Sequence, residues 1–200
     1  MMQSIPPAQR LSRPLAHHPL RNLPTSVFLD TNVLLDHLMQ RDGESGAATA
    51  LLKTCVRHDI PLRCAATTLK DIAYVAEATL RRELAAKGRA EQADASSRDG
   101  AERSPLERET IRCLIRRMPW HCVEQTRALC DIVAIDQETC DQAFSLRNRH
   151  DDFEDDLIVA AALRSGSDYL ATSDKRLIDH FPELCATPRR LVEMVDGKGA

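Results

Sequence analysis

The chain has 200 residues, a length that allows one domain with its own hydrophobic core. Its hydrophobic fraction of 43% and charged fraction of 28% are typical of a soluble globular protein. No apolar run approaches the roughly 20 residues that a membrane-spanning helix needs, and no secretory signal opens the chain. We therefore expect a cytoplasmic protein that is not attached to a membrane.

The net charge of −3 conceals an uneven distribution. Residues 1–25 contain three arginines and no acidic residue, so the rest of the chain carries a net charge of −6. An acidic body is a poor electrostatic partner for a polyanion. It becomes a suitable one when the acidic groups surround a cation, because the ion inverts the local charge.

The cysteines give no sign of a zinc site or a redox motif. They number seven, are spread along the chain, and include no C-x-x-C pair. Several stand beside apolar residues, such as Cys113 next to Leu114. We interpret most of them as small, reduced residues of a core.

Strand-like and helix-like segments alternate along the chain. Apolar runs predict strands at 26–30, 60–66, 131–136 and 168–174, with an edge strand at 189–195. Helical patterns predict helices at 31–40, 46–58, 67–87, 105–118, 122–131, 136–148, 151–166 and 174–181, with Pro119 breaking the fourth from the fifth and Gly166 ending the seventh. This alternation predicts a three-layer α/β/α fold with a central, mostly parallel sheet of four to five strands.

Two segments do not fit this alternation. Residues 1–25 are rich in arginine and proline and show no periodicity, so we expect a disordered arm. Residues 88–104 contain no large apolar residue, and we expect a flexible insertion there. The folded domain is therefore predicted over residues 26–196.

Acidic residues follow or face the carboxyl ends of the predicted strands, where open parallel sheets bind ligands. Asp30 closes the first strand, and Asp174 follows the fourth. Two helices contribute further acids in their first turns, namely Asp71, Glu154, Asp155 and Asp156. Carboxylates gathered at one edge would repel one another, and a hard divalent cation removes that penalty.

Most of these acids also have a purely structural interpretation. Asp71 lies three residues after Thr68, as in a capping box, and Asp155 could simply favour a helix dipole. Asp174 could cap the short helix that follows it. Asp30 is the hardest to explain in this way, because an uncompensated charge at the end of an apolar strand is costly.

Four segments, VFLDTNVLLDHL, TTLKDIAYV, DFEDDLIVAAAL and DYLATSD, occur in an order that resembles the PIN domain family. The resemblance runs from about Ser26 to Val195. It implies an α/β/α nuclease in which three or four acidic residues bind Mg²⁺ or Mn²⁺. Many bacterial members are VapC-type toxin ribonucleases that a cognate antitoxin holds inactive, and this chain is similar to them.

The resemblance assigns Asp30, Asp155 and Asp174 as metal ligands. It adds Asp71 as a fourth catalytic residue, although many members have glutamate there and the shorter side chain could merely cap its helix. Asp155 and Asp156 are about 100° apart on their helix, so only one should face the metal, and we favour Asp155. Supporting roles behind the ligands are expected for Thr31, Asn32, Glu154, Asp156, Thr172 and Ser173, although Thr31 and Asn32 could equally be a plain helix cap.

Other polar and aromatic residues carry weaker signals. Cations that flank the motifs are Lys70, Arg147, Arg149, Lys175 and Arg176, and most such charges are solvated surface groups. We interpret His150 as a surface histidine. Trp120 and Phe153 are interpreted as packing residues rather than as platforms for stacking bases.

The sequence therefore predicts an endoribonuclease that depends on Mg²⁺ or Mn²⁺ and leaves 5′-phosphate and 3′-hydroxyl ends. The partners that the resemblance implies are an RNA substrate, a cognate antitoxin and a second copy of the chain. The main rival is a PIN-like protein that binds RNA or a partner without cutting. An aspartate-nucleophile phosphatase is disfavoured because Asp30-Thr31-Asn32 is not Asp-x-Asp, and a Rossmann enzyme because no G-x-G-x-x-G occurs.

Overall fold

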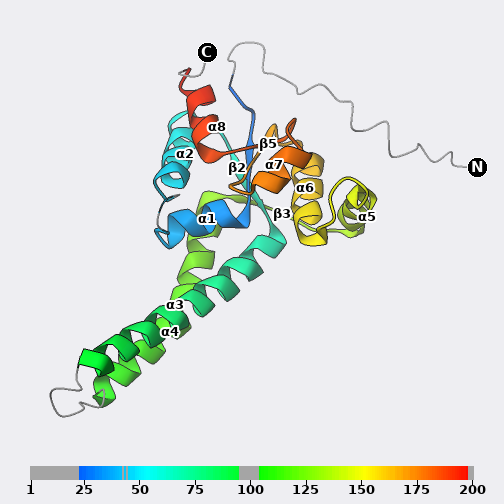
Figure 1. The fold of residues 1–200 in the computed structure, drawn as a ribbon. Helices are drawn as coiled ribbons and strands as arrows, with labels where there is room; N and C mark the ends of the chain where they lie inside the picture. The colour runs from blue at the N-terminus through cyan, green and yellow to red at the C-terminus, as the bar shows by residue number, and fades with distance from the viewer. Residues whose placement is uncertain (1–22, 42, 44, 95–103, 198–200) are drawn as a thin grey trace, which may run out of the picture.

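A computed structural model describes residues 23–41, 43, 45–94 and 104–197 (Figure 1). None of the helices in these residues is long and apolar enough to cross a membrane. The elements follow one another as β1 (Val27–Leu29), α1 (Thr31–Leu38), α2 (Ser45–Arg57), β2 (Leu62–Ala65), α3 (Ala66–Asp94), α4 (Pro105–Leu129), β3 (Asp131–Val133), α5 (Gln137–Leu146), α6 (Phe153–Ser165), β4 (Tyr169–Ala171), α7 (Lys175–His180), β5 (Cys185–Ala186) and α8 (Pro188–Val195).

The five strands form one parallel sheet in the order β3-β2-β1-β4-β5. This confirms the predicted α/β architecture with a central parallel sheet. The chain moves outward from β1 to β2 and β3, and then crosses back to place β4 and β5 on the other side of β1. The carboxyl ends of β1 and β4 consequently lie side by side at the point where the strand order reverses, which is where such sheets bind ligands.

The sheet separates two hydrophobic cores, because alternate residues of each strand point to opposite faces. Val27 and Leu29 of β1 pack with apolar residues of α1, α2, α3 and α8. Phe28, between them in the sequence, packs with α6, α7 and the end of α5. Helices therefore cover both faces of the sheet, as the three-layer prediction requires (Figure 1).

Helices α3 and α4 form a long antiparallel pair that projects away from the sheet (Figure 1). Helix α3 continues to Asp94, so residues 88–94 are helical, contrary to the flexible insertion expected over 88–104. Good helix formers among these residues, such as Ala, Glu and Gln, outweigh the single Gly88. Residues 95–103 of that segment lie outside the described residues.

The sequence predicted that Pro119 would break the helix, and this prediction is wrong. Helix α4 runs without interruption from Pro105 to Leu129 with Pro119 inside it. Proline removes one backbone hydrogen bond and usually kinks or ends a helix. Here Pro119 is buried where α4 lies along α3, so tertiary packing accommodates it inside the helix.

The predicted edge strand at 189–195 is also wrong, because these residues belong to α8. The fifth strand is β5, which lies just before them. Thr187 caps α8, and Pro188 occupies the first turn, where its missing N–H costs nothing. The buried residues of α8 are spaced as on one face of a helix, namely Pro188, Leu191 and Val195. The prediction failed because a short apolar run can form either a strand or a helix.

The domain begins slightly earlier than predicted. Leu23 packs against the first core, and the hydroxyl of Thr25 donates a hydrogen bond of 2.8 Å to Asp168 Oδ2. These residues were assigned to the arm on composition alone. The rest of the expected arm, residues 1–22, lies outside the described residues.

Replacing Thr187 by alanine tests the helical assignment of α8. The hydroxyl of Thr187 accepts a hydrogen bond from the backbone N–H of Arg190. We expect Thr187→Ala to lower the free energy of unfolding in urea by about 1 kcal/mol, the usual contribution of such a cap. Thr110→Ala, at an exposed position inside α4, is the control, and its cost should be smaller because alanine favours a helix interior. Equal losses in the two variants would contradict the cap.

Candidate active site

Asp30 is a buried carboxylate at the carboxyl end of the central strand. Only 5% of its surface is exposed, and its backbone N–H extends the pairing of β1 with β4 by bonding to Ala171 O at 3.0 Å. The hydroxyl of Thr172, itself fully buried, donates a hydrogen bond of 2.8 Å to Asp30 Oδ2. Burial raises the pKa of Asp30, and this hydrogen bond opposes the increase by stabilising the charged form.

Thr172 also joins Asp30 to Asp174. While its hydroxyl donates to Asp30, the same oxygen accepts a hydrogen bond of 3.0 Å from the backbone N–H of Asp174. Asp174 in turn caps α7, because its Oδ1 accepts bonds from the N–H groups of Arg176 and Leu177. The capping interpretation of Asp174 is thus correct, but its charge is also close enough to raise the pKa of Asp30.

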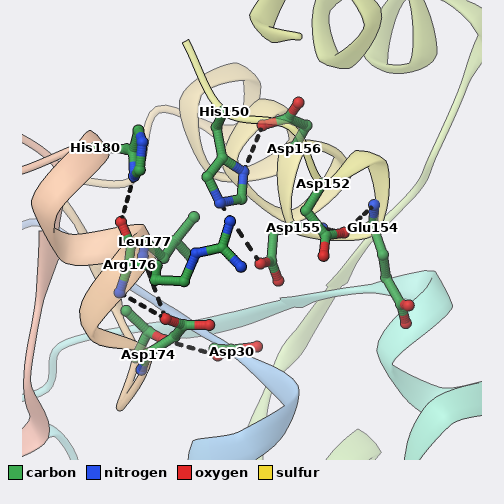
Figure 2. Close-up of polar contacts among 11 residues, drawn as sticks. Asp30, His150, Asp152, Glu154, Asp155, Asp156, Asp174, Arg176, Leu177 and His180 are labelled. Carbon is green, nitrogen blue, oxygen red and sulfur yellow. Dashed lines mark hydrogen bonds and ion pairs between the residues drawn. The ribbon is translucent and has the colours of Figure 1, made fainter.

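Asp155 approaches the same space from the first turn of α6 (Figure 2). Burial is the main reason that its pKa rises to about 6, and the negative charges of Asp152, Asp30 and Asp174 add to the increase. Figure 2 shows Asp30, Asp155 and Asp174 directed toward one another from three separate elements. The structure therefore brings together the three carboxylates that the sequence singled out as ligands.

Asp156 points away from these carboxylates (Figure 2). It is almost fully buried and contacts the ring of His150, with Asp156 Oδ1 3.2 Å from His150 Nδ1. Of the two adjacent aspartates, Asp155 is therefore the one that faces Asp30. The turn of about 100° between neighbouring helical residues explains why the two carboxylates diverge.

His150 is buried, contrary to the prediction of a surface histidine. Its other ring nitrogen, Nε2, lies 3.9 Å from Asp155 Oδ2, so the ring stands between Asp155 and Asp156. Edge contacts with the rings of His180 and Phe181 hold it on its other sides. The sequence showed only that His150 stands just before an acidic helix start. It could not show that residues at the end of α7 pack over the histidine ring.

Asp71 stands apart from the three central carboxylates. Its carboxylate forms an ion pair of 2.9 Å with Lys70, its neighbour in the sequence. Asp71 is not among the groups that most affect the pKa of Asp30 or Asp155. Glu154 is exposed, and its charge acts on Lys70 rather than on Asp30.

The remaining supporting residues contribute mainly through their backbone. The N–H groups of Thr31 and Asn32 lower the pKa of Asp30, although neither makes a capping hydrogen bond to its side chain. The Thr31 hydroxyl instead donates to Thr68 at 3.4 Å. Ser173 has a buried hydroxyl that has no hydrogen-bond partner among the described residues.

The five cations flanking the motifs differ in whether they already have a partner. Arg149 is engaged elsewhere, in an ion pair with Glu183 and over the ring of Phe181, and Arg147 lies over the ring of Phe144. Lys175 and Arg176 are exposed in the first turn of α7, directly after Asp174. Lys70, the fifth of these cations, is paired with Asp71. Among the described residues that flank the motifs, Lys175 and Arg176 are therefore the cations with no ion pair or ring contact.

The donor set suits a hard divalent cation. Carboxylate oxygens are what Mg²⁺ and Mn²⁺ prefer. A bound cation would stabilise the charged form of Asp155, whose pKa is raised mainly by burial and further by the neighbouring carboxylates. In the conformations of the described residues, no three His, Cys, Asp or Glu side chains are close enough to hold one ion. Rotation of the Asp155 and Asp174 side chains would be needed, and the cap on α7 uses only Oδ1 of Asp174.

The acidic residues lie at the crossover of a parallel sheet, which is the usual place of a ligand site in an α/β protein. Comparison with known families identifies the kind of α/β protein. A family model described as "PIN domain" matches residues 26–176. Because this match covers more than half of the chain, the protein belongs to the PIN domain family. PIN domains are generally nucleases that act on RNA or DNA, and they typically use divalent metal ions. Neither the curated proteins nor the solved structures gave a match.

The pKa of Asp155 predicts how stability depends on pH without metal. Since the pKa rises from 3.8 to about 6 on folding, the folded state holds its proton more tightly than the unfolded state. This contribution to stability is complete below pH 4 and is lost as the pH rises through about 6. We expect Asp155→Asn to flatten this part of the profile and to raise the melting temperature at pH 7.5 in EDTA.

The control for this experiment is Asp141→Asn, at an exposed position on α5. It should keep the wild-type dependence of melting temperature on pH between 4 and 7.5. If wild type and Asp155→Asn showed the same dependence of melting temperature on pH, the raised pKa of Asp155 would be contradicted.

Proposed function

We propose that the protein is an endoribonuclease that depends on Mg²⁺ or Mn²⁺. The single observation that supports this most is the convergence of Asp30, Asp155 and Asp174 at the crossover of a PIN domain sheet. A structural role alone does not explain three mutually repelling carboxylates, because each would be more stable without the others. The proposed metal ligands are Asp30, Asp155 and Asp174. Asp71 is proposed as a fourth catalytic residue that does not bind the metal directly.

The chemistry that a bound ion supplies is to lower the pKa of a coordinated water and to shield the charge of the phosphate. The protein's own residues prepare the site for it. Thr172 fixes the Asp30 carboxylate, and His150 restricts the rotation of Asp155 and Asp156. The exposed cations Lys175 and Arg176, which directly follow Asp174, would add positive charge for a bound phosphate.

We propose further that the enzyme works in the cytoplasm as the toxin of a toxin–antitoxin pair. Support for this comes from the resemblance of its motifs to VapC-type toxins. A cognate antitoxin and a second copy of the chain are the partners that follow from this role.

Removing the charge of Asp30 separates catalysis from folding. We expect Asp30→Asn to lose Mn²⁺-dependent RNA cleavage by at least about a hundredfold, since a metal ligand is gone. Its circular dichroism spectrum should match that of wild type, because asparagine can still accept the Thr172 hydrogen bond. Asp141→Asn is the control and should cleave normally. If wild type fails to cleave RNA with Mn²⁺ but still binds it, the non-catalytic alternative is correct.

The chemistry also predicts the ends of the products. When a water-derived hydroxide bonds to phosphorus and the P–O3′ bond breaks, the ribose O3′ leaves and takes up a proton, which gives a 5′-phosphate and a 3′-hydroxyl. We expect the downstream RNA fragments to be substrates for a 5′-phosphate-dependent exonuclease without prior kinase treatment. Fragments with 2′,3′-cyclic phosphate ends would reject this mechanism, because they arise from attack by the ribose 2′-hydroxyl.

A further inference from the structure

The projecting pair of helices α3 and α4 carries a groove that the proposed catalytic site does not use. Its volume is about 760 Å³, and side chains of both helices line it. Along α3 the lining residues include Lys70, Tyr74, Glu77 and Arg81, which recur at the spacing of one helix face. At 1.5 Å per residue, this face is about 17 Å long from Lys70 to Arg81, which is room for a few nucleotides.

The groove is strongly basic although the chain as a whole is acidic. Its lining contains five basic residues, Lys70, Arg81, Arg108, Arg112 and Arg116, and a single acidic residue, Glu77. Arg81 and Arg112 are held by neighbouring glutamates on their own helices. No ion pair among the described residues engages Arg108 or Arg116, so these two guanidinium groups are available for an anion.

Two exposed aromatic side chains lie among these cations. Tyr74 is 75% exposed and Trp120 is 70% exposed, and both line the groove. The interpretation of Trp120 as a packing residue is therefore wrong. Exposed rings that alternate with arginines form the surface on which proteins stack the bases and bind the phosphates of a single strand.

The inner end of the groove lies near the carboxylates. Helix α3 starts directly after β2, at the same edge of the sheet as Asp30. The hydrogen bond from Thr31 to Thr68 links the residue after Asp30 to the first turn of α3. Lys70, which lines the groove, is also close enough to Glu154, beside Asp155, to be affected by its charge.

We propose that this groove binds single-stranded RNA and leads it to the carboxylates. The inference rests on the proposed function for the identity of the polymer, and on Tyr74, Trp120, Arg108 and Arg116 for the mode of binding. A duplex fits poorly, because its bases are already stacked on one another and cannot reach the rings. A second copy of this chain is the other occupant that the experiment below tests, because its net charge of −3 would also be attracted to a basic groove.

The chain contains a single tryptophan, so its fluorescence reports on the groove directly. The experiment titrates wild-type protein in EDTA, which prevents cleavage, with a single-stranded RNA of about ten nucleotides. We expect quenching of Trp120 fluorescence that saturates, and at least tenfold weaker binding of a duplex of the same sequence. A fluorescence signal that follows protein concentration and ignores RNA would show a self-association surface and overturn the inference.

Variants then separate stacking from charge. Binding is followed by the anisotropy of labelled RNA. Tyr74→Ala and Trp120→Ala should each weaken it about tenfold, as expected for the loss of one stacked base. Arg116→Gln should weaken binding and reduce the slope of log affinity against log salt by about 0.7, the value for one phosphate contact on a single strand. Arg189→Gln, at an exposed position on α8 away from the groove, is the matched control and should change neither quantity.

A small substrate distinguishes failure of this inference from failure of the proposed function. Bis(p-nitrophenyl) phosphate is too small to span the groove, so with Mn²⁺ all three groove variants should hydrolyse it at the wild-type rate. Their cleavage of RNA should fall in parallel with affinity. If all three variants bind and cleave RNA like wild type, the groove inference is wrong while the function stands. If RNA quenches Trp120 but wild type hydrolyses neither substrate, the proposed function is wrong while the groove stands.

Discussion

A carboxyl group buried at the end of the central strand is the constraint on which the site depends. Burial removes the water that would stabilise a charged Asp30. Hydrogen bonds from the Thr172 hydroxyl and from nearby backbone N–H groups compensate for only part of this loss, so the pKa of Asp30 is raised. The crossover places Thr172 beside Asp30, because β1 and β4 are neighbours in space although far apart in sequence. The same topology brings Asp155 and Asp174 to this edge, where all three carboxylates are directed toward one another (Figure 2). On the proposed function, the binding of a divalent cation would offset the stability cost that they carry in the free protein.

The acidic residues of the candidate site and the basic residues of the groove lie on different parts of the molecule. The carboxylates lie at the sheet edge, whereas the arginines of the groove lie on α3 and α4, which project from the body (Figure 1). A polyanionic substrate would be repelled by the first region without a cation and attracted by the second. On the two proposals above, binding and chemistry would take place on separate surfaces, and an acidic chain could in this way act on RNA.

The sequence predicted the parts of the molecule that depend on local patterns. Asp30 and Asp174 could be placed at one edge because apolar strands end just before them, and Gly166 correctly marked the end of α6. What failed depended on tertiary contacts. Pro119 is tolerated because α3 packs against α4, His150 is buried because α7 covers it, and Trp120 is exposed because its helix leaves the body. The helix α8 was missed although the Thr187-Pro188 start was visible in the sequence.

The most direct test of the proposed site is a crystal structure of the protein grown with Mn²⁺, whose anomalous scattering identifies the ion. We predict one Mn²⁺ coordinated by oxygens of Asp30, Asp155 and Asp174, with Asp156 still in contact with His150. An ion bound instead by exposed acids such as Asp151, with Asp30 free of metal, would contradict the central claim.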